Sequence, residues 1–193
     1  MCGYGRLLGL YKAVNRVVQT GVPGDIVECG VARGGSAAMI GLTMAKLRAH
    51  RRLWMYDTFE GLPEPTKDDP DYEIAREFTG RCRGTLDEVE DLFRLLKIDG
   101  FSRYVKGRFE DSLPGTKPDA VAVLHLDGDW YQSVRVCLDS LWDRVSKGGI
   151  VQIDDYGHWA GARKAVDSFL HERGIRVRLQ YLDYTGRQLV KEA

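Results

Sequence analysis

The chain has 193 residues, 44% hydrophobic and 29% charged, which is typical of one globular domain with a full hydrophobic core. Basic and acidic residues both number 28, and this zero net charge argues against a general binder of nucleic acid. No apolar run approaches the roughly 20 residues that cross a bilayer, and the first residues lack a signal-peptide core.

The cysteines Cys2, Cys29, Cys82 and Cys137 are widely spaced and form no C-x-x-C pair. Isolated cysteines without a secretion signal are typical of reduced thiols that pack as small hydrophobes inside the cell. We therefore expect a cytoplasmic protein without a disulfide and without a cysteine-bound metal.

Helices and strands alternate along the N-terminal half. The predicted elements are a helix over residues 6–20, a strand over 25–29, a glycine loop over 32–36, a helix over 37–49 and a strand over 51–58. Gly21 is placed to end the first helix, and Ser36 is placed to cap the second. Asp57 comes at the end of the second strand.

A long segment over residues 58–85, rich in Pro, Gly, Asp and Glu, separates the two halves. Long loops in compact domains tend to be lids or binding loops, and we expect a short helix over 72–78 within this one. Thr85 and Glu88 fit a capping box at the start of a helix over 86–97.

The C-terminal half continues the alternation. Its predicted elements are a strand over 102–107, a loop over 109–115, a strand over 120–127, a helix over 131–145, a strand over 150–154 after a turn at Gly148 and Gly149, a helix over 159–173, and strands over 176–183 and 187–191 around a turn at Thr185–Gly186. This order predicts an α/β fold with a mostly parallel sheet, helices on both faces and a hairpin at one edge. We expect one domain, with an N-terminal helical cap over residues 1–24 and a core over 25–193.

Acidic residues follow every parallel strand of this predicted sheet. Ligands of open α/β sheets bind at the carboxyl ends of the strands, near the point where strand order reverses. The residues expected there are Glu28, Gly30, Gly34, Gly35 and Ser36 after the first strand, Asp57 and Phe59 after the second, Glu110, Asp111 and Ser112 after the third, Asp127 and Asp129 after the fourth, and Asp154 and Asp155 after the fifth.

The segment E-C-G-V-A-R-G-G-S after the first strand lacks the G-x-G-x-x-G spacing that holds a pyrophosphate. Glu28 would also repel a diphosphate at this position. Asp57, at the end of the next strand, is placed to hold ribose hydroxyls. Together these residues favour a nucleoside ligand without a diphosphate, which S-adenosylmethionine fits; the alternative is a tight strand–helix turn with no ligand.

Asp127, Asp154 and Asp155 end two strands that this topology places side by side. Three carboxylates with no nearby cysteine form a hard oxygen site suited to Mg²⁺, Mn²⁺ or Ca²⁺. The alternative is helix capping, which would explain one aspartate for each helix but not two adjacent ones. Asp129 is expected to cap a helix or to accept a hydrogen bond beside the site.

His158 follows Asp154 by four residues and is a candidate general base, although it can equally be structural. His125, inside the fourth strand, is expected in the core or next to the site. Four aromatic residues can either line an acceptor pocket or pack in the core: Trp130, Tyr131, Tyr156 and Trp159.

Four motifs in order, GDIVECGVARGGS, YDTFEGLP, HLDGDWYQSV and GGIVQIDDYGHWAGARKAVDSF, resemble those of the TylF/MycF/NovP-type O-methyltransferases, also called the macrocin O-methyltransferase family. The resemblance covers about residues 20–190. It implies a Rossmann-like class I methyltransferase fold, with a seven-stranded sheet whose last strand is antiparallel. It also implies S-adenosylmethionine as methyl donor, Mg²⁺ as cofactor, and sugar hydroxyls of natural products as acceptors.

Matched by position, the resemblance implies metal ligands at Asp127, Asp154 and Asp155. It also implies cofactor contacts at Glu28, Ser36, Asp57 and Asp111, to which the strand-end pattern adds Gly30 and Ser112. The chain departs from the family in the short segment before the first strand, over residues 1–24, where other members carry helices that cover the active site and build the oligomer. It departs from the related catechol-type enzymes at Trp130, where those enzymes carry a lysine.

The sequence thus predicts a Mg²⁺- and S-adenosylmethionine-dependent O-methyltransferase in which Asp127 or His158 takes the proton of a small-molecule hydroxyl. We expect a homo-oligomer that binds neither nucleic acid nor membrane. Two alternatives remain open: a nicotinamide-dependent oxidoreductase on a similar sheet, and a non-catalytic cofactor-binding protein.

Overall fold

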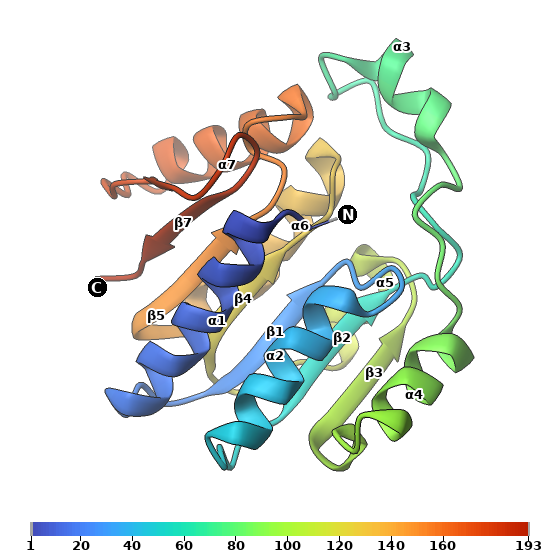
Figure 1. The fold of residues 1–193 in the computed structure, drawn as a ribbon. Coiled ribbons are helices and arrows are strands. Elements are labelled where there is room, and N and C mark those ends of the chain that lie inside the picture. Colours follow the sequence, from blue (N-terminus) through green and yellow to red (C-terminus); the bar gives the residue numbers. More distant parts are fainter. Residues whose placement is uncertain (1, 193) are drawn as a thin grey trace.

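Seven strands form one sheet in the computed structural model, which describes residues 2–192 (Figure 1). The strands are β1 (Asp25–Cys29), β2 (Leu53–Asp57), β3 (Ser102–Lys106), β4 (Val121–Leu126), β5 (Val145–Ile153), β6 (Gln180–Tyr181) and β7 (Arg187–Val190). Their order across the sheet is β3-β2-β1-β4-β5-β7-β6, and β7 runs antiparallel to both of its neighbours. This arrangement confirms the predicted fold class and the hairpin at the sheet edge.

Helices cover both faces of the sheet, and each face has its own apolar core (Figure 1). The helices on one face are α1 (Tyr4–Gln19), α2 (Gly35–Lys46) and α4 (Leu86–Leu95); those on the other are α5 (Phe109–Gly115), α6 (Tyr131–Leu141) and α7 (Ala160–Glu172). The short α3 (Tyr72–Ala75) belongs to the long connection between β2 and α4, which lies at the end of the sheet where the parallel strands finish.

A line of polar residues crosses the buried centre of the sheet. Glu28 of β1 lies opposite His125 of β4, His125 lies opposite Gln152 of β5, and Gln152 lies opposite Gln188 of β7. The first three side chains are fully buried, although β1, β4 and β5 are otherwise apolar. Buried polar groups need hydrogen-bond partners. These residues therefore hold one another together at a single place in the apolar core.

Gly30 allows the ends of β1 and β4 to approach closely. Its φ is +94°, and a Cβ at this position would lie 1.8 Å from the carbonyl oxygen of Asp127. Only glycine avoids both the left-handed strain and this overlap. The close approach brings the glycine loop after β1 next to the acidic segment after β4.

Several predicted elements have the expected bounds. The strands β1 and β3, the short helix near residue 72 and the hairpin turn at Thr185–Gly186 are confirmed. Thr85 and Glu88 form the predicted capping box, with the Glu88 amide donating to Thr85 Oγ1 and the Thr85 amide donating to Glu88 Oε2. Within residues 2–192, no helix combines the length and apolar character needed to cross a membrane.

The loop predicted over 109–115 is wrong, because these residues form α5. Pro114 and Gly115 were the misleading signals. In so short a helix the proline removes only one backbone hydrogen bond, and Glu110 and Asp111 stabilise the first turn through the helix dipole.

The predicted cap at Ser36 is also wrong. Gly34 takes the cap position of α2 with a φ of +79°, and Ser36 lies buried in the first turn. The tight approach of this loop to Val89 of α4 leaves room only for a small residue in the left-handed conformation.

Two boundaries in the C-terminal half differ from the prediction. The helix predicted over 131–145 ends at Leu141, and β5 begins at Val145, so Gly148 and Gly149 lie inside the strand. The strand predicted over 176–183 shortens to Gln180–Tyr181, which pair with Gln188 and Arg187 of β7. Its alternating apolar side chains still pack partly against the core.

Replacing Gly30 by alanine should lower the free energy of unfolding by about 3 kcal/mol or more, because the added methyl overlaps backbone and a left-handed alanine is strained. The matched control is Gly35→Ala, where no atom lies within 4 Å of the added carbon and φ is not positive. Urea unfolding should place the control within about 0.5 kcal/mol of the wild type. Equal loss in both variants would contradict the close approach.

Candidate functional site

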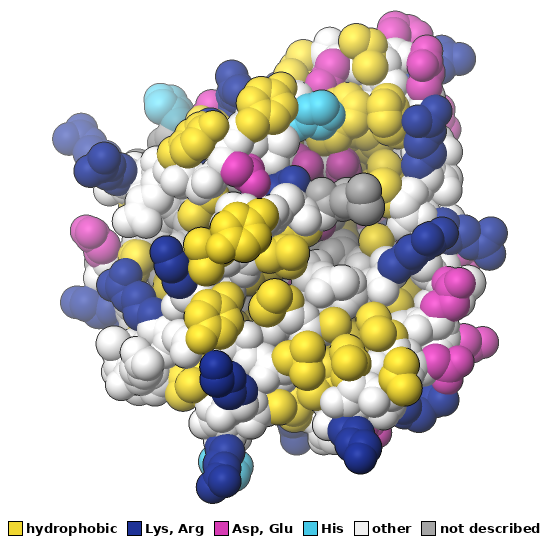
Figure 2. Space-filling view, in the orientation of Figure 1, with side chains coloured by type: hydrophobic (Ala, Val, Ile, Leu, Met, Phe, Trp, Pro, Cys, Tyr) yellow, Lys and Arg dark blue, Asp and Glu magenta, His cyan; other side chains and the backbone are white. Residues whose placement is uncertain are grey.

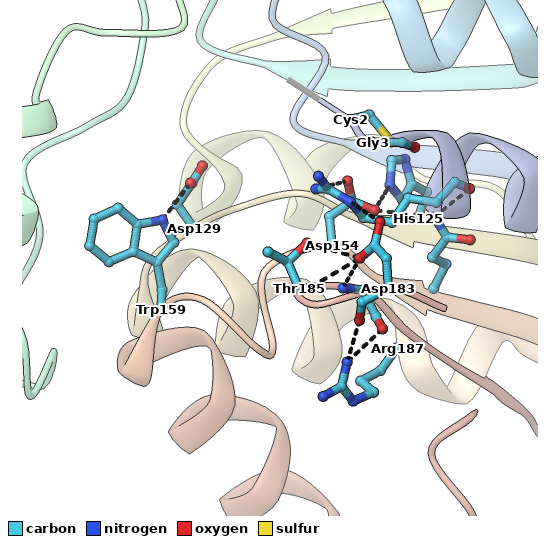
Figure 3. Close-up of polar contacts among 12 residues, drawn as sticks. Cys2, Gly3, His125, Asp129, Asp154, Trp159, Asp183, Thr185 and Arg187 are labelled. Atoms are coloured by element: carbon cyan, nitrogen blue, oxygen red, sulfur yellow. Dashed lines mark hydrogen bonds and ion pairs between the residues drawn. The ribbon is translucent and has the colours of Figure 1, made fainter. Parts of the chain in front are cut away.

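Within this polar line, His125 of β4 joins charged groups of the neighbouring strands (Figure 3). His125 Nδ1 lies 2.8 Å from Glu28 Oε1, and His125 Nε2 lies 2.8 Å from Asp154 Oδ1. Two carboxylates at hydrogen-bond distance require both ring nitrogens to donate, so the imidazole is protonated. Although burial alone would lower it, Asp154 and Glu28 raise the pKa of His125 well above its usual range.

Asp154 receives three donors and is already held in place. Arg6 Nη1 lies 2.8 Å from Oδ2, while Gln152 Nε2 donates to Oδ1 over 3.1 Å beside His125. Burial opposes ionisation, but the positive charges of His125 and Arg6 and the amide of Gln152 lower the pKa of Asp154. Asp154 is therefore ionised and held by several donors.

A second group of carboxylates lies beside it, and Trp159 Nε1 donates to one of them, Asp129. Asp127, Asp129 and Asp155 bring carboxylate oxygens within 4.8 Å of one another, and Asp127 forms a similar group with His125 and Asp154. Burial, followed by the neighbouring acids, raises the pKa of Asp127 and Asp155 well above the usual range. The same causes raise the pKa of Asp129 to about 8.

The composition of this group fits a hard divalent cation. Asp155 Oδ2 is buried and, within residues 2–192, accepts no hydrogen bond. An orphaned carboxylate oxygen next to further carboxylates is unfavourable unless a cation or protons compensate it. Oxygen ligands of this type suit Mg²⁺, Mn²⁺ or Ca²⁺. Of the three predicted ligands, Asp127 belongs to both groups, whereas Asp154 and Asp155 lie in different ones.

The glycine loop after β1 is organised by Asp57. The amides of Val31 and Ala32 donate to Asp57 Oδ2 over 2.6 and 3.0 Å, and the amide of Phe59 donates to Oδ1 over 2.7 Å. The carboxylate thus joins the ends of β1 and β2, and most of its acceptor capacity is used within the protein.

The other predicted cofactor residues lie around this loop. Glu28 is fully buried, and its Oε2 has no hydrogen-bond partner among the described residues. Gly30 and Ser36 flank the loop between β1 and α2. Asp111 and Ser112 lie on α5 after β3, where Asp111 is exposed and Ser112 donates its hydroxyl to the carbonyl of Arg108. The structure therefore gathers most of the predicted set at one edge and leaves Asp111 and Ser112 toward β3.

The long connection over residues 58–85 is tied to the starts of two helices. Asp69 accepts a hydrogen bond from the Tyr131 amide at the first residue of α6, and Asp71 accepts one from the Ala160 amide at the first residue of α7. Lys164 of α7 donates to the carbonyl of Asp68. This segment, which we call the strap, thus fastens across the helices that follow the acidic segments.

Asp129 does not cap α6, so that half of the prediction is wrong, because the strap residue Asp69 does so instead. Asp129 adopts a φ of +55° and accepts a hydrogen bond from Trp159 Nε1 over 3.0 Å, which confirms its expected role as an acceptor beside the site. Figure 3 shows this pair apart from Asp154 and Asp183.

The aromatic residues near the acids divide between core and surface. Trp130 is only 1% exposed, and its Nε1 donates to the strap carbonyl of Pro63, so it packs rather than lining an open pocket. Trp159 packs edge to face on Trp130. His158 is exposed, with its ring 4.8 Å from that of Trp159.

Two residues of this site, Arg6 and Asp69, were missed from the sequence. Arg6 lies on α1 and binds both Asp154 and Asp183, the latter through Nε over 3.2 Å. Asp69 lies in the strap. Each has no motif of its own, and its partner lies more than 60 residues away in the chain. The glycines around Arg6 in GYGRLLG were the available signal, since a Cβ at Gly5 would lie 2.9 Å from the carbonyl oxygen of Leu182.

Comparison with known proteins finds one family over nearly the whole chain. The family model described as macrocin-O-methyltransferase (TylF) matches residues 1–190. A tetracenomycin 4'-O-methyltransferase of Streptomyces olivaceus, named for its 8-demethyl-8-(2,3-dimethoxy-alpha-L-rhamnosyl)-tetracenomycin C substrate, is 41% identical over 96% of this chain and 73% of its own length. The demethyldecarbamoylnovobiocin O-methyltransferase of Streptomyces niveus is 35% identical with the same coverage. The mycinamicin III 3''-O-methyltransferase of Micromonospora griseorubida is 32% identical over 96% of this chain and 76% of its own.

Solved structures agree with this finding. The O-methyltransferase NovP superposes with a TM-score of 0.91 at 31% identity, covering 99% of this chain and 81% of that one. The calicheamicin methyltransferase CalS11 shares the fold, with a TM-score of 0.78 at 22% identity over 95% of this chain and 77% of that one.

Replacing His125 by alanine should cost about 3–5 kcal/mol of folding free energy, because it leaves two buried carboxylates without their shared partner. His125→Gln, which can retain one hydrogen bond, should lose less. Urea unfolding at neutral pH measures both, with exposed His50→Ala as the control. A loss below about 1 kcal/mol in His125→Ala would contradict the buried ion chain.

Proposed function

Because the chain belongs to the macrocin O-methyltransferase family, we propose that it transfers a methyl group from S-adenosylmethionine to a sugar hydroxyl of a natural product, with Mg²⁺ at its acidic site. One observation carries this proposal: the glycine loop after β1 and the carboxylates after β4 and β5 lie against each other, joined by the close approach at Gly30. A donor on the loop would thus lie beside an acceptor at the acids.

The nucleoside part of the donor fits the loop between β1 and α2. Gly35 leaves space at the start of α2, since a Cβ there would meet no atom of the described residues within 4 Å, and Glu28 offers an unpartnered carboxylate oxygen for a cationic or hydroxyl group. Asp57 keeps the loop in shape through its three amide contacts, and its remaining acceptor capacity can reach a ribose hydroxyl.

Asp127, Asp154 and Asp155 would hold the cation. When bound, Mg²⁺ supplies positive charge that lowers the pKa of an acceptor hydroxyl. The role of the protein is to fix these carboxylates: His125, Arg6 and Gln152 prevent Asp154 from turning away, and Asp129 is held by Trp159. Holding donor and acceptor at the same sheet edge then supplies much of the rate.

Asp127 or His158 would take the acceptor proton. Asp127 lies within the carboxylate group, beside the place where the cation would hold the hydroxyl. His158 lies at the exposed rim, next to Trp159, where an incoming hydroxyl would pass.

The acceptor class follows from the relatives. A rhamnosyl group appears in the name of the Streptomyces olivaceus enzyme's substrate, and we propose a deoxysugar hydroxyl of this kind as the acceptor here.

Asp155→Asn should lower methyl transfer at saturating Mg²⁺ at least a hundredfold, because it removes the carboxylate with a free buried oxygen. Calorimetric binding of S-adenosylhomocysteine should change less than about threefold, since Asp155 lies outside the glycine loop. Asp119→Asn, fully exposed before β4, is the control. Full activity in excess EDTA would overturn the metal proposal, and binding of NAD in place of S-adenosylhomocysteine would overturn the donor.

Mg²⁺ should stabilise the protein more as pH rises from about 5 to about 8. The raised pKa of Asp127 and Asp155 means that the cation-free folded state keeps protons that the unfolded state releases above about pH 4, so its stability falls with rising pH. The cation replaces those protons and removes this loss.

The measurement is the difference in Tm between excess MgCl₂ and EDTA at each pH. Asp155→Asn should flatten the difference and Asp119→Asn should not. A wild-type difference that stays constant with pH would contradict the assigned protonation.

His158→Gln should lower kcat by about a hundredfold, with little change in cofactor affinity, if His158 is the proton acceptor. An unchanged kcat would assign the proton to Asp127 instead.

A further inference from the structure

The turn between β6 and β7 is held rigidly beside the acidic site. Asp183 Oδ1 accepts hydrogen bonds from the amides of Thr185 and Gly186, and its Oδ2 binds Arg6, which also binds Asp154. The Gly157 amide donates to the carbonyl of Thr185 over 2.8 Å. The turn is thus tied both to a proposed metal ligand and to the residues that follow it.

Tyr184 sits at the tip of this turn with no packing role of its own. Its backbone is fixed, since a Cβ at Gly157 would lie 1.9 Å from the Tyr184 carbonyl oxygen. Its side chain is nevertheless 66% exposed. Among residues 2–192, its one ring contact is with His158, at 6.1 Å between centroids and 77° between planes.

His158, the ring partner of Tyr184, also lines a hollow at the start of α7. The hollow has a volume of about 440 Å³ and is lined by His158, Trp159 and Lys164, among others. That volume lies in the range of small-molecule sites. Figure 2 shows hydrophobic, histidine and acidic side chains gathered in the upper part of the face in view.

An exposed ring on a fixed backbone, next in sequence to Asp183, has the chemistry of a sugar-binding surface. One face of a pyranose presents C–H groups that pack on an aromatic ring, while its hydroxyls need polar partners. Here the carboxylates would take the hydroxyls, and the aromatic ring would take the C–H face.

We propose that Tyr184, together with His158, packs against the ring of the sugar acceptor and selects which face of that ring meets the acidic site. This inference rests on the proposed function and names the recognition that it requires. Tyr184 acts through contact area, so its hydroxyl is not needed.

The test uses methyl α-L-rhamnopyranoside as the probe, in saturation-transfer NMR with S-adenosylhomocysteine and MgCl₂ present. Tyr184→Ala should raise the Kd for the probe about tenfold, whereas Tyr184→Phe should stay within about twofold of the wild type. The control is Tyr181→Ala: this tyrosine belongs to the same hairpin and is 68% exposed, but its ring faces Arg187. It should also stay within about twofold.

Equal affinity in wild type and Tyr184→Ala would overturn the inference, as would equal weakening in Tyr181→Ala. A wild type that transfers no saturation to the probe would overturn it too. Calorimetry with S-adenosylhomocysteine separates these outcomes from failure of the proposed function. If the wild type binds the cofactor normally and Tyr184→Ala leaves the Kd for the probe unchanged, only the inference about Tyr184 is rejected. Thermal melts confirm that each variant is folded.

Discussion

The buried imidazolium of His125 is the interaction on which the arrangement of the site depends. It lies between Glu28 and Asp154 at 2.8 Å from each, in the centre of the sheet. Without a positive charge there, two carboxylates could not be buried in an apolar core. Because they are compensated, the strands β1, β4 and β5 can end in acids at the same edge.

The same ion chain links the sheet to α1 and to the turn between β6 and β7. Arg6 extends it from the sheet to α1 and then to the hairpin turn through Asp183. On the other side, the strap fastens to α6 and α7 through Asp69 and Asp71. The carboxylates between these attachments have fixed backbones but incomplete compensation, which suits a site that binds and releases a cation.

Most of the fold could be predicted from the sequence, because it depends on local periodicity. Strand β1 was predicted with its observed bounds, and the acids after β4 and β5 were correctly expected side by side. The failures have physical causes: Pro114 is tolerated in a short helix, and Gly34 caps α2 because the loop is too tight for Ser36.

The candidate site was predictable only where it follows strand ends. The acids after β4 and β5 obey that rule. Arg6 and Asp69 do not, because each reaches the site through a contact between distant segments. The capping of α6 by the strap could not be foreseen either. Asp129 lies directly before this helix in the sequence and was the obvious capping residue.

The ion pair between Arg6 and Asp183 also determines when the site can form. Its partners are 177 residues apart, so α1 must wait for that length of chain before it finds this contact. During synthesis the helix emerges well before its anchor on the hairpin. Closing so long a loop carries an entropic cost that local contacts do not offset. Assembly of the acidic site is therefore expected as a late event, after the central strands have paired, which keeps its uncompensated carboxylates in water until the core exists.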